Sequence, residues 1–178
     1  GKRLSIAVHP KTSEPGGWSG PKAQDWKRLG AAADEFKIMT YDFSGAWSAA
    51  GPIAPLDWAD DVLSFGESVV PPQKVMMGVP FYGRDWHTGA TTDLQYDQIQ
   101  ELIGKHQPQI GRDASSQEAY FSFAAGRGTL HQVYFQDATT VAARMTLLKN
   151  KHPRLGGIAI WRMGGEPAEF WDAIAAAH

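Results

Sequence analysis

Side chains that could bind a ligand follow three short apolar runs of the sequence. Tyr41 and Asp42 come after the first run, Tyr82 and Arg84 come after the second, and Trp161 ends the third. Phenol, carboxylate and guanidinium groups make directional hydrogen bonds, and an indole ring offers a flat apolar surface. Such a set suits a neutral ligand that carries many hydroxyl groups.

The apolar runs have the length and composition of buried β-strands. The run from Val75 to Pro80 is continuously apolar, which is typical of parallel strands that are covered on both faces. Parallel strands end at a common edge of their sheet, so we expect the polar and aromatic groups to converge there. The expected strands are 4–8, 36–41, 75–80 and 157–161, and the expected helices are 23–33, 56–69, about 138–150 and about 168–177.

The regular alternation of strand and helix breaks between about residues 87 and 137. This segment is too long for an ordinary strand-to-helix loop. Within it we expect a helix at 96–105 and two strands at 119–123 and 129–135, joined by a hairpin turn at Gly126-Arg127-Gly128. The pattern predicts a small α+β insertion over one end of the parallel strands.

The composition excludes several classes of function. A net charge of −2 provides no basic surface for nucleic acid or an anionic membrane, and the chain has no Cys for disulfides or thiolate metal sites. No apolar run approaches the roughly 18 residues of a membrane span. The His residues lack metal-ligand spacing, and no Gly-x-Gly-x-x-Gly turn is present, so we expect neither a metal nor another cofactor.

Four strand-helix units leave two alternatives for the fold, an open doubly wound sheet or half of a β/α barrel. A complete (β/α)₈ barrel takes roughly 250 residues, and four strands cannot close one. For a half-barrel we expect apolar edges that are covered by an N-terminal half, by a second copy or by a swapped neighbour. The missing dinucleotide motif weakens the doubly wound alternative.

Three motifs resemble, in order, the sixth, seventh and eighth strands of the family 18 glycoside hydrolases, which include the chitinases. They are Met39-Thr-Tyr41-Asp42-Phe, Met77-Gly-Val-Pro80-Phe-Tyr82-Gly83-Arg84-Asp-Trp86 and Gly156-Gly157-Ile-Ala-Ile-Trp161. The segment 2–12 then resembles the fifth strand, so that the resemblance covers the whole chain. It implies an α/β fold in which residues 1–178 form the C-terminal half (strands 5–8) of a (β/α)₈ TIM barrel, with the insertion after the seventh barrel strand.

Two further segments are similar to a bacterial branch of the family that holds spore-cortex and peptidoglycan N-acetylglucosaminidases. They are 54–58, Ala-Pro-Leu-Asp-Trp, and 131–137, His-Gln-Val-Tyr-Phe-Gln-Asp. In that branch Glu usually precedes the final Asp, and Gln136 departs from this pattern. The resemblance implies a bacterial extracellular or cell-envelope location and a polysaccharide partner that contains N-acetylglucosamine, without nucleic acid or membrane partners.

The family resemblance also implies a mechanism and a role for several residues. Family 18 enzymes retain the anomeric configuration, and the 2-acetamido oxygen of the substrate itself is the nucleophile. By the match, Tyr41 and Asp42 orient the acetamide group and are the catalytic candidates in this chain. Met39 packs beneath the acetamide, and Trp161 forms the apolar floor under the reacting sugar.

The remaining candidates bind substrate. The resemblance implies that Tyr82 and Arg84 line the cleft and bind sugar hydroxyls, and that Trp86 stands on the cleft rim. Trp18 and Trp47 lie on strand-to-helix loops, where stacking on a sugar and ordinary packing are equally good interpretations of their role. We expect Trp58, on a helix face, to belong to the core.

One part of the family's catalytic machinery is absent from these 178 residues. The general acid of the family is a Glu at the end of an Asp-x-x-Asp-x-Asp-x-Glu run on the fourth strand, and no segment has this spacing. We therefore expect the chain to be part of a hydrolase for β-1,4-linked N-acetylglucosamine polymers, chitin or peptidoglycan, and to be inactive alone. The alternative is a non-catalytic, chitinase-like carbohydrate-binding protein.

Overall fold

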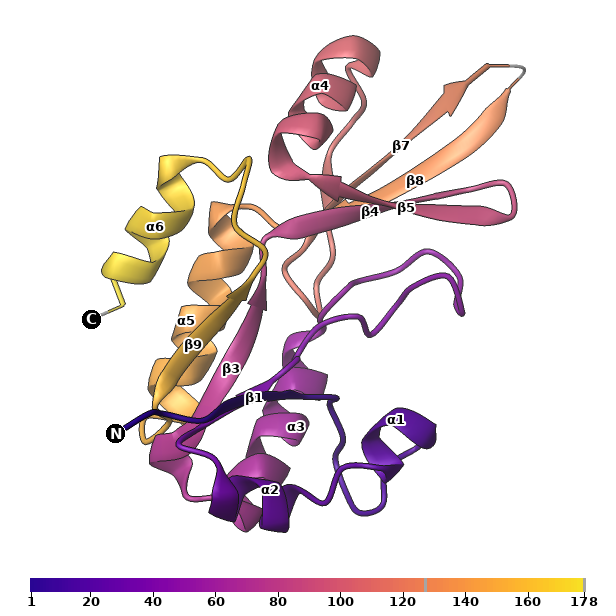
Figure 1. Cartoon of the computed structure of the whole chain (residues 1–178). Coiled ribbons are helices and arrows are strands. Elements are labelled where there is room, and N and C mark those ends of the chain that lie inside the picture. Colours follow the sequence, from indigo (N-terminus) through magenta and orange to yellow (C-terminus); the bar gives the residue numbers. More distant parts are fainter. Residues whose placement is uncertain (127, 178) are drawn as a thin grey trace.

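The computed structural model describes residues 1–126 and 128–177 and contains two sheets (Figure 1). The first sheet has four parallel strands, whose order in space follows their order in the chain. Its strands are β1 (Ser5–Val8), β2 (Glu35–Ile38), β3 (Val75–Pro80) and β9 (Gly157–Trp161). A doubly wound sheet reverses its strand order at a switch point, and this sheet does not, so that alternative was wrong.

Helices lie between the strands of the first sheet and after its last strand, and they bury its apolar side chains. They are α1 (Ser19–Lys22), α2 (Trp26–Ala32), α3 (Leu56–Val69), the 3₁₀ helix η1 (Pro72–Lys74), α5 (Ala138–Lys151) and α6 (Ala168–Ala175). Phe36 of β2, Leu63 of α3, Val79 of β3, Val141 of α5 and Phe170 of α6 are fully buried in one core. No helix among the described residues is long and apolar enough to cross a membrane.

Strand β2 ends at Ile38, three residues earlier than expected, because the chain turns there. The Thr40 and Tyr41 N–H groups donate to the carbonyls two residues before them, and the Thr40 hydroxyl donates to the Gly78 carbonyl of β3 at 2.6 Å. A Cβ on Gly78 would lie 2.5 Å from the Ile38 carbonyl oxygen, so only glycine permits this close approach. The turn delivers Tyr41 and the following residue to the C-terminal edge of the sheet.

The second sheet is antiparallel and begins directly after β3, as Figure 1 shows. Its strands, in spatial order, are β5 (Ala90–Gln95), β4 (Tyr82–His87), β8 (Thr129–Phe135), β7 (Ala119–Ala125) and β6 (Gly111–Arg112). Helix α4 (Tyr96–His106) packs on one face through Ile99, in a core with Phe121 and Val133. Arg127, in the turn expected between the last two long strands, lies outside the described residues.

This sheet begins at Tyr82, five residues before the expected start of the insertion at 87. Residues 82–87 carry charged side chains among aromatic ones and resemble a loop at a strand end. They form a strand because β5 and β8 pair with it on both sides. Residues 82–87, which were expected only to line the site, therefore also form a strand of the second sheet.

A carboxylate at the start of α5 joins this helix to the second sheet. The Asp137 side chain accepts a hydrogen bond from the Thr140 N–H at 2.9 Å and one from Arg112 Nη2 of β6 at 2.6 Å. Burial opposes ionisation of Asp137, but these hydrogen bonds outweigh it and hold the pKa of the carboxyl below its ordinary value. The ionised carboxylate thus stabilises the junction.

We expect Asp137→Asn to lower the free energy of unfolding by about 1 kcal/mol near neutral pH, because Asn still caps the helix but loses the ion pair with Arg112. The folded-state pKa lies below the unfolded one, so this stability is present above the unfolded pKa and is lost as pH falls through the folded pKa. Urea unfolding across that acidic range should show the two proteins converging. Asp172→Asn, on the exposed face of α6, is the control, and a gap that stays constant with pH contradicts the assignment.

Candidate active site

Two pockets meet at Asp42, at the C-terminal edge of the parallel sheet. The larger has a volume of about 1010 Å³ and contains Met39, Tyr41 and Asp42 in its wall. The smaller, of about 300 Å³, is lined by Asp42 together with residues from the starts and ends of β4, β5 and β9. They are Tyr82, Arg84, Asp93, Leu94, Gln95, Trp161 and Arg162. Six of the seven expected site residues thus lie in two adjoining cavities.

The backbone of Asp42 is left-handed, and two side chains hold one oxygen of its carboxylate. Its φ is +62°, in the left-handed region that Asp tolerates better than most residues. Its Oδ1 accepts hydrogen bonds from the Tyr82 hydroxyl at 2.5 Å and from Arg84 Nη2 at 2.9 Å. Within the described part of the chain, Oδ2 accepts no hydrogen bond, which leaves this oxygen for a ligand donor.

Arg84 is buried and holds the site together by three hydrogen bonds. Besides Asp42, it donates from Nε to Asp93 Oδ1 at 2.6 Å and from Nη1 to the Ser44 carbonyl at 2.8 Å. Burial works against its charge, but the hydrogen bond that it donates to Asp93 and the charge of Asp42 raise the pKa of Arg84. The guanidinium is therefore a fixed cation between two carboxylates.

The two tyrosines at the site remain protonated and can donate hydrogen bonds. Burial, and next to it the negative charge of Asp42, raise the pKa of Tyr41 to about 12. The same two causes raise the pKa of Tyr82. The Tyr82 hydroxyl already donates to Asp42, whereas Tyr41 makes no side-chain hydrogen bond with the described residues. Tyr41 thus offers its proton to a ligand acceptor.

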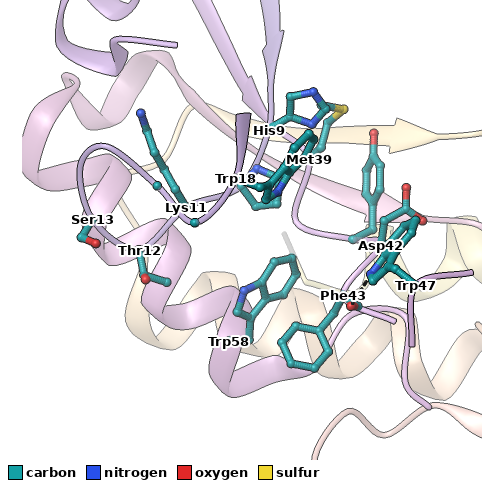
Figure 2. A pocket seen from close by; sticks show the side chains of 14 residues that line it. His9, Lys11, Thr12, Ser13, Trp18, Met39, Asp42, Phe43, Trp47 and Trp58 are labelled. Carbon is teal, nitrogen blue, oxygen red and sulfur yellow. Dashed lines mark hydrogen bonds between the residues drawn. The ribbon is translucent and has the colours of Figure 1, made fainter. Parts of the chain in front are cut away.

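Aromatic rings line the larger pocket on several sides. Figure 2 shows Trp18 and Met39 on one side of it, and Trp58 and Phe43 on the other. Trp47 is 68% exposed at the mouth and donates its indole N–H to the Phe43 carbonyl. Exposed flat rings beside a carboxylate and a phenol match the demands of a polyhydroxylated ligand.

One expectation about the tryptophans was wrong and another held only in part. Trp86 does not stand on a rim: it is only 8% exposed, and its indole N–H donates to the Gly45 carbonyl at 3.1 Å. It faces inward because β4 is a central strand of the second sheet. Trp58 packs against the main core, as expected, but it is half-buried and also forms part of the wall of the larger pocket.

Asp93 is a site residue that the sequence interpretation missed. It lies opposite Arg84 in the β4–β5 hairpin, whose two-residue turn is Thr88-Gly89. Gly89 has a positive φ in this turn, a conformation that glycine adopts readily. Thr-Gly is not among the favoured two-residue hairpin turns, so the local sequence carried no strong signal for the pairing of Asp93 with Arg84.

The described residues contain no group of three or more His, Asp or Glu side chains arranged to hold a metal ion. The chemistry of the two pockets instead rests on the carboxylates of Asp42 and Asp93, protonated phenols and aromatic surfaces. This set can bind and orient a sugar that bears an amide group. It contains no second carboxylate placed across the larger pocket from Asp42.

The molecule is therefore an α/β protein with a candidate ligand site at the C-terminal edge of a singly wound parallel sheet. The model of the glycosyl hydrolases family 18 matches residues 1–166, and the chain belongs to this family. The motifs had indicated the same family, and the comparison confirms it.

Relatives of known sequence or structure include chitinases and spore cortex-lytic enzymes. The cortical fragment-lytic enzyme of Bacillus anthracis is 31% identical over 98% of this chain and 41% of its own length. The crystal structure of a chitinase from Chromobacterium violaceum matches 98% of this chain and 55% of its own with a TM-score of 0.89 and 31% identity. The spore cortex-lytic enzyme SleL of Bacillus cereus matches 98% of this chain and 41% of its own, with a TM-score of 0.88 and 29% identity. The chain spans about half the length of these relatives.

Proposed function

We propose that the chain is the C-terminal half, strands 5–8, of the barrel of a family 18 hydrolase that cleaves β-1,4-linked N-acetylglucosamine polymers. Asp42 carries this proposal, because it joins the two pockets and keeps one oxygen free for a ligand. The relatives that are chitinases and cortical fragment-lytic enzymes support chitin or peptidoglycan as substrate and an extracellular or cell-envelope location.

In the proposed reaction, Tyr41 and Asp42 act on the 2-acetamido group of the reacting sugar. The Tyr41 hydroxyl donates to the acetamide oxygen, and Asp42 Oδ2 accepts from the acetamide N–H. The acetamide oxygen then bonds to the anomeric carbon as the bond to the leaving oxygen breaks, and that oxygen takes a proton from the family's general-acid Glu, which would come from the N-terminal half of the barrel. Water later opens the oxazolinium ring and returns a proton to that Glu. The negative charge of Asp42 stabilises the positive charge that develops on that ring.

The other candidates position the sugar and Asp42. Trp161, which is 55% exposed at the end of β9, offers its ring as the floor beneath the reacting sugar. Met39 packs beneath the acetamide from the larger pocket. Arg84 and Tyr82 line the smaller pocket, and their hydrogen bonds to Asp42 Oδ1 direct the other oxygen toward the ligand.

The edges of the parallel sheet are consistent with a continuing barrel. β1 and β9 are its edge strands, Leu4 before β1 is 54% exposed, and Ile158 and Ile160 of β9 are half-buried. An uncovered apolar edge invites pairing with further strands. We propose that the N-terminal half of the barrel, or a second copy of this chain, covers them.

The proposed half-barrel should bind insoluble chitin or peptidoglycan but release no sugar from either. The general-acid motif is absent from its sequence, and such an acid contributes roughly 10²–10⁴-fold to the rate. Co-sedimentation with the polymer and a reducing-end assay on the supernatant measure both properties, with cellulose as the control polymer. Hydrolysis at a rate typical of complete family 18 enzymes contradicts the half-barrel assignment, and equal sedimentation with cellulose contradicts the proposed substrate.

A further inference from the structure

A buried ionic cluster lies beneath the loop that follows Asp42, residues 43–55. Glu118, before β7, Gln136, after β8, and Arg144 of α5 are each 1% exposed or less. Arg144 Nη2 lies 3.4 Å from Glu118 Oε1, and Arg144 Nε donates to Gln136 Oε1 at 3.4 Å. None of the three lines either pocket. The cluster therefore requires an explanation other than ligand contact.

Both carboxylate oxygens of Glu118 accept hydrogen bonds from the backbone of that loop. Oε2 accepts from the Ile53 N–H and Oε1 from the Ala54 N–H, each at 2.7 Å. Arg144 Nη2 donates to the Ala54 carbonyl at 2.5 Å, so the residue is held from both sides. Burial raises the pKa of the Glu118 carboxyl, whereas the charge of Arg144 and the two N–H groups oppose the shift. A buried carboxylate is tolerated here because its partners compensate its desolvation.

A hydrogen bond within the loop connects the residues held by Glu118 to the neighbour of Asp42. The Ile53 carbonyl accepts a hydrogen bond from the Phe43 N–H at 2.7 Å, and Phe43 is the neighbour of Asp42. The same loop is held at its other end, where Trp86 donates to the Gly45 carbonyl. Two backbone-mediated steps thus connect Glu118, just before β7 of the second sheet, to Asp42, which follows β2 of the first sheet.

We propose that Glu118 is a positioning residue for glycan binding, which fixes Ile53 and, through the Phe43 N–H, the left-handed backbone of Asp42. The inference rests on the proposed function for the ligand that Asp42 binds. It gives the insertion a role in setting the geometry of the site beyond forming a wall of the cleft. It also gives the buried carboxylate of Glu118 a role in the site.

The variant Glu118→Gln tests this role, because its amide keeps one acceptor but turns a donor toward the second backbone N–H. We expect binding of chitotriose to weaken about tenfold, since the buried N–H that loses its acceptor displaces the loop. In ¹H–¹⁵N NMR spectra, the Trp86 indole N–H signal should move and the Phe43 amide should exchange faster, although neither touches Glu118. Glu101→Gln, on the exposed face of α4, is the matched control and should change none of these.

Unchanged Trp86 and Phe43 signals in folded Glu118→Gln protein overturn the proposal. If that variant does not fold, native-state hydrogen exchange of the unmodified chain decides: the Phe43, Ile53 and Ala54 amides should open together with similar protection. Much faster exchange of Phe43 than of the other two overturns the coupling. If the unmodified chain binds no chitotriose, the proposed function fails, while the indole signal and the exchange rates still test the positioning role.

Discussion

Replacing Asp42 with Asn is expected to weaken chitotriose binding about 100-fold while leaving the fold intact. Asn tolerates the left-handed conformation, so the φ of +62° at this position remains accessible. The Asp42 side chain is 43% exposed, and its loss of charge therefore affects the ligand more than the stability. The variant loses the charged acceptor for Tyr82, for Arg84 and for the acetamide N–H of the ligand.

Isothermal titration with chitotriose measures this effect, and circular dichroism checks the fold of the variant. Asp61→Asn, on the exposed face of α3, is the control for a general effect of removing one negative charge. If Asp42→Asn binds chitotriose as well as the unmodified chain does, Asp42 is not the ligand-binding carboxylate.

Replacing Arg144 with Met should have the largest effect on stability, a loss of about 3–5 kcal/mol in the free energy of unfolding. Arg144 and Glu118 are both fully buried, and removing the guanidinium leaves the carboxylate without its counter-charge. The Ala54 carbonyl and the Gln136 amide lose their partner at the same time. Met fills similar volume, so the expected loss is mostly electrostatic.

Urea unfolding of three variants separates these causes. Lys149→Met, on the exposed face of α5, should change stability little. The double variant Glu118→Gln with Arg144→Met should be more stable than Arg144→Met alone, because it removes the stranded carboxylate. A single-variant loss below about 1 kcal/mol is the result that contradicts a buried ion pair.

Local sequence signals predicted the elements of the first sheet well. The helix expected at 56–69 and the strands expected at 75–80 and 157–161 have those bounds in the structure, since Pro71-Pro72 stops the helix and the strands are continuously apolar. The end of β2 was misplaced because the turn there depends on Thr40 reaching the carbonyl of Gly78. That contact joins residues distant in sequence and leaves no local pattern.

In the site, too, some features were predictable from local sequence and others depended on contacts between distant residues. The strand-end positions of Tyr41, Asp42 and Trp161 follow from the parallel-strand pattern, and their proposed roles come from the family motifs. The partners that hold Asp42 in place were not predictable, since Arg84 is oriented by the β4–β5 pairing with Asp93. Burial of Trp86 likewise depends on β4 being central, which only the strand order of the second sheet reveals.

The most direct test of the central claim compares two trisaccharides that differ only in the group Tyr41 and Asp42 are proposed to hold. Isothermal titration of the 178-residue chain with chitotriose and with cellotriose, which lacks the 2-acetamido groups, measures both affinities under one set of conditions. Our proposal predicts that chitotriose binds at least about tenfold more tightly, because cellotriose leaves the Tyr41 donor and the Asp42 acceptor without partners. Equal affinities for the two sugars, or no binding of chitotriose, would contradict it.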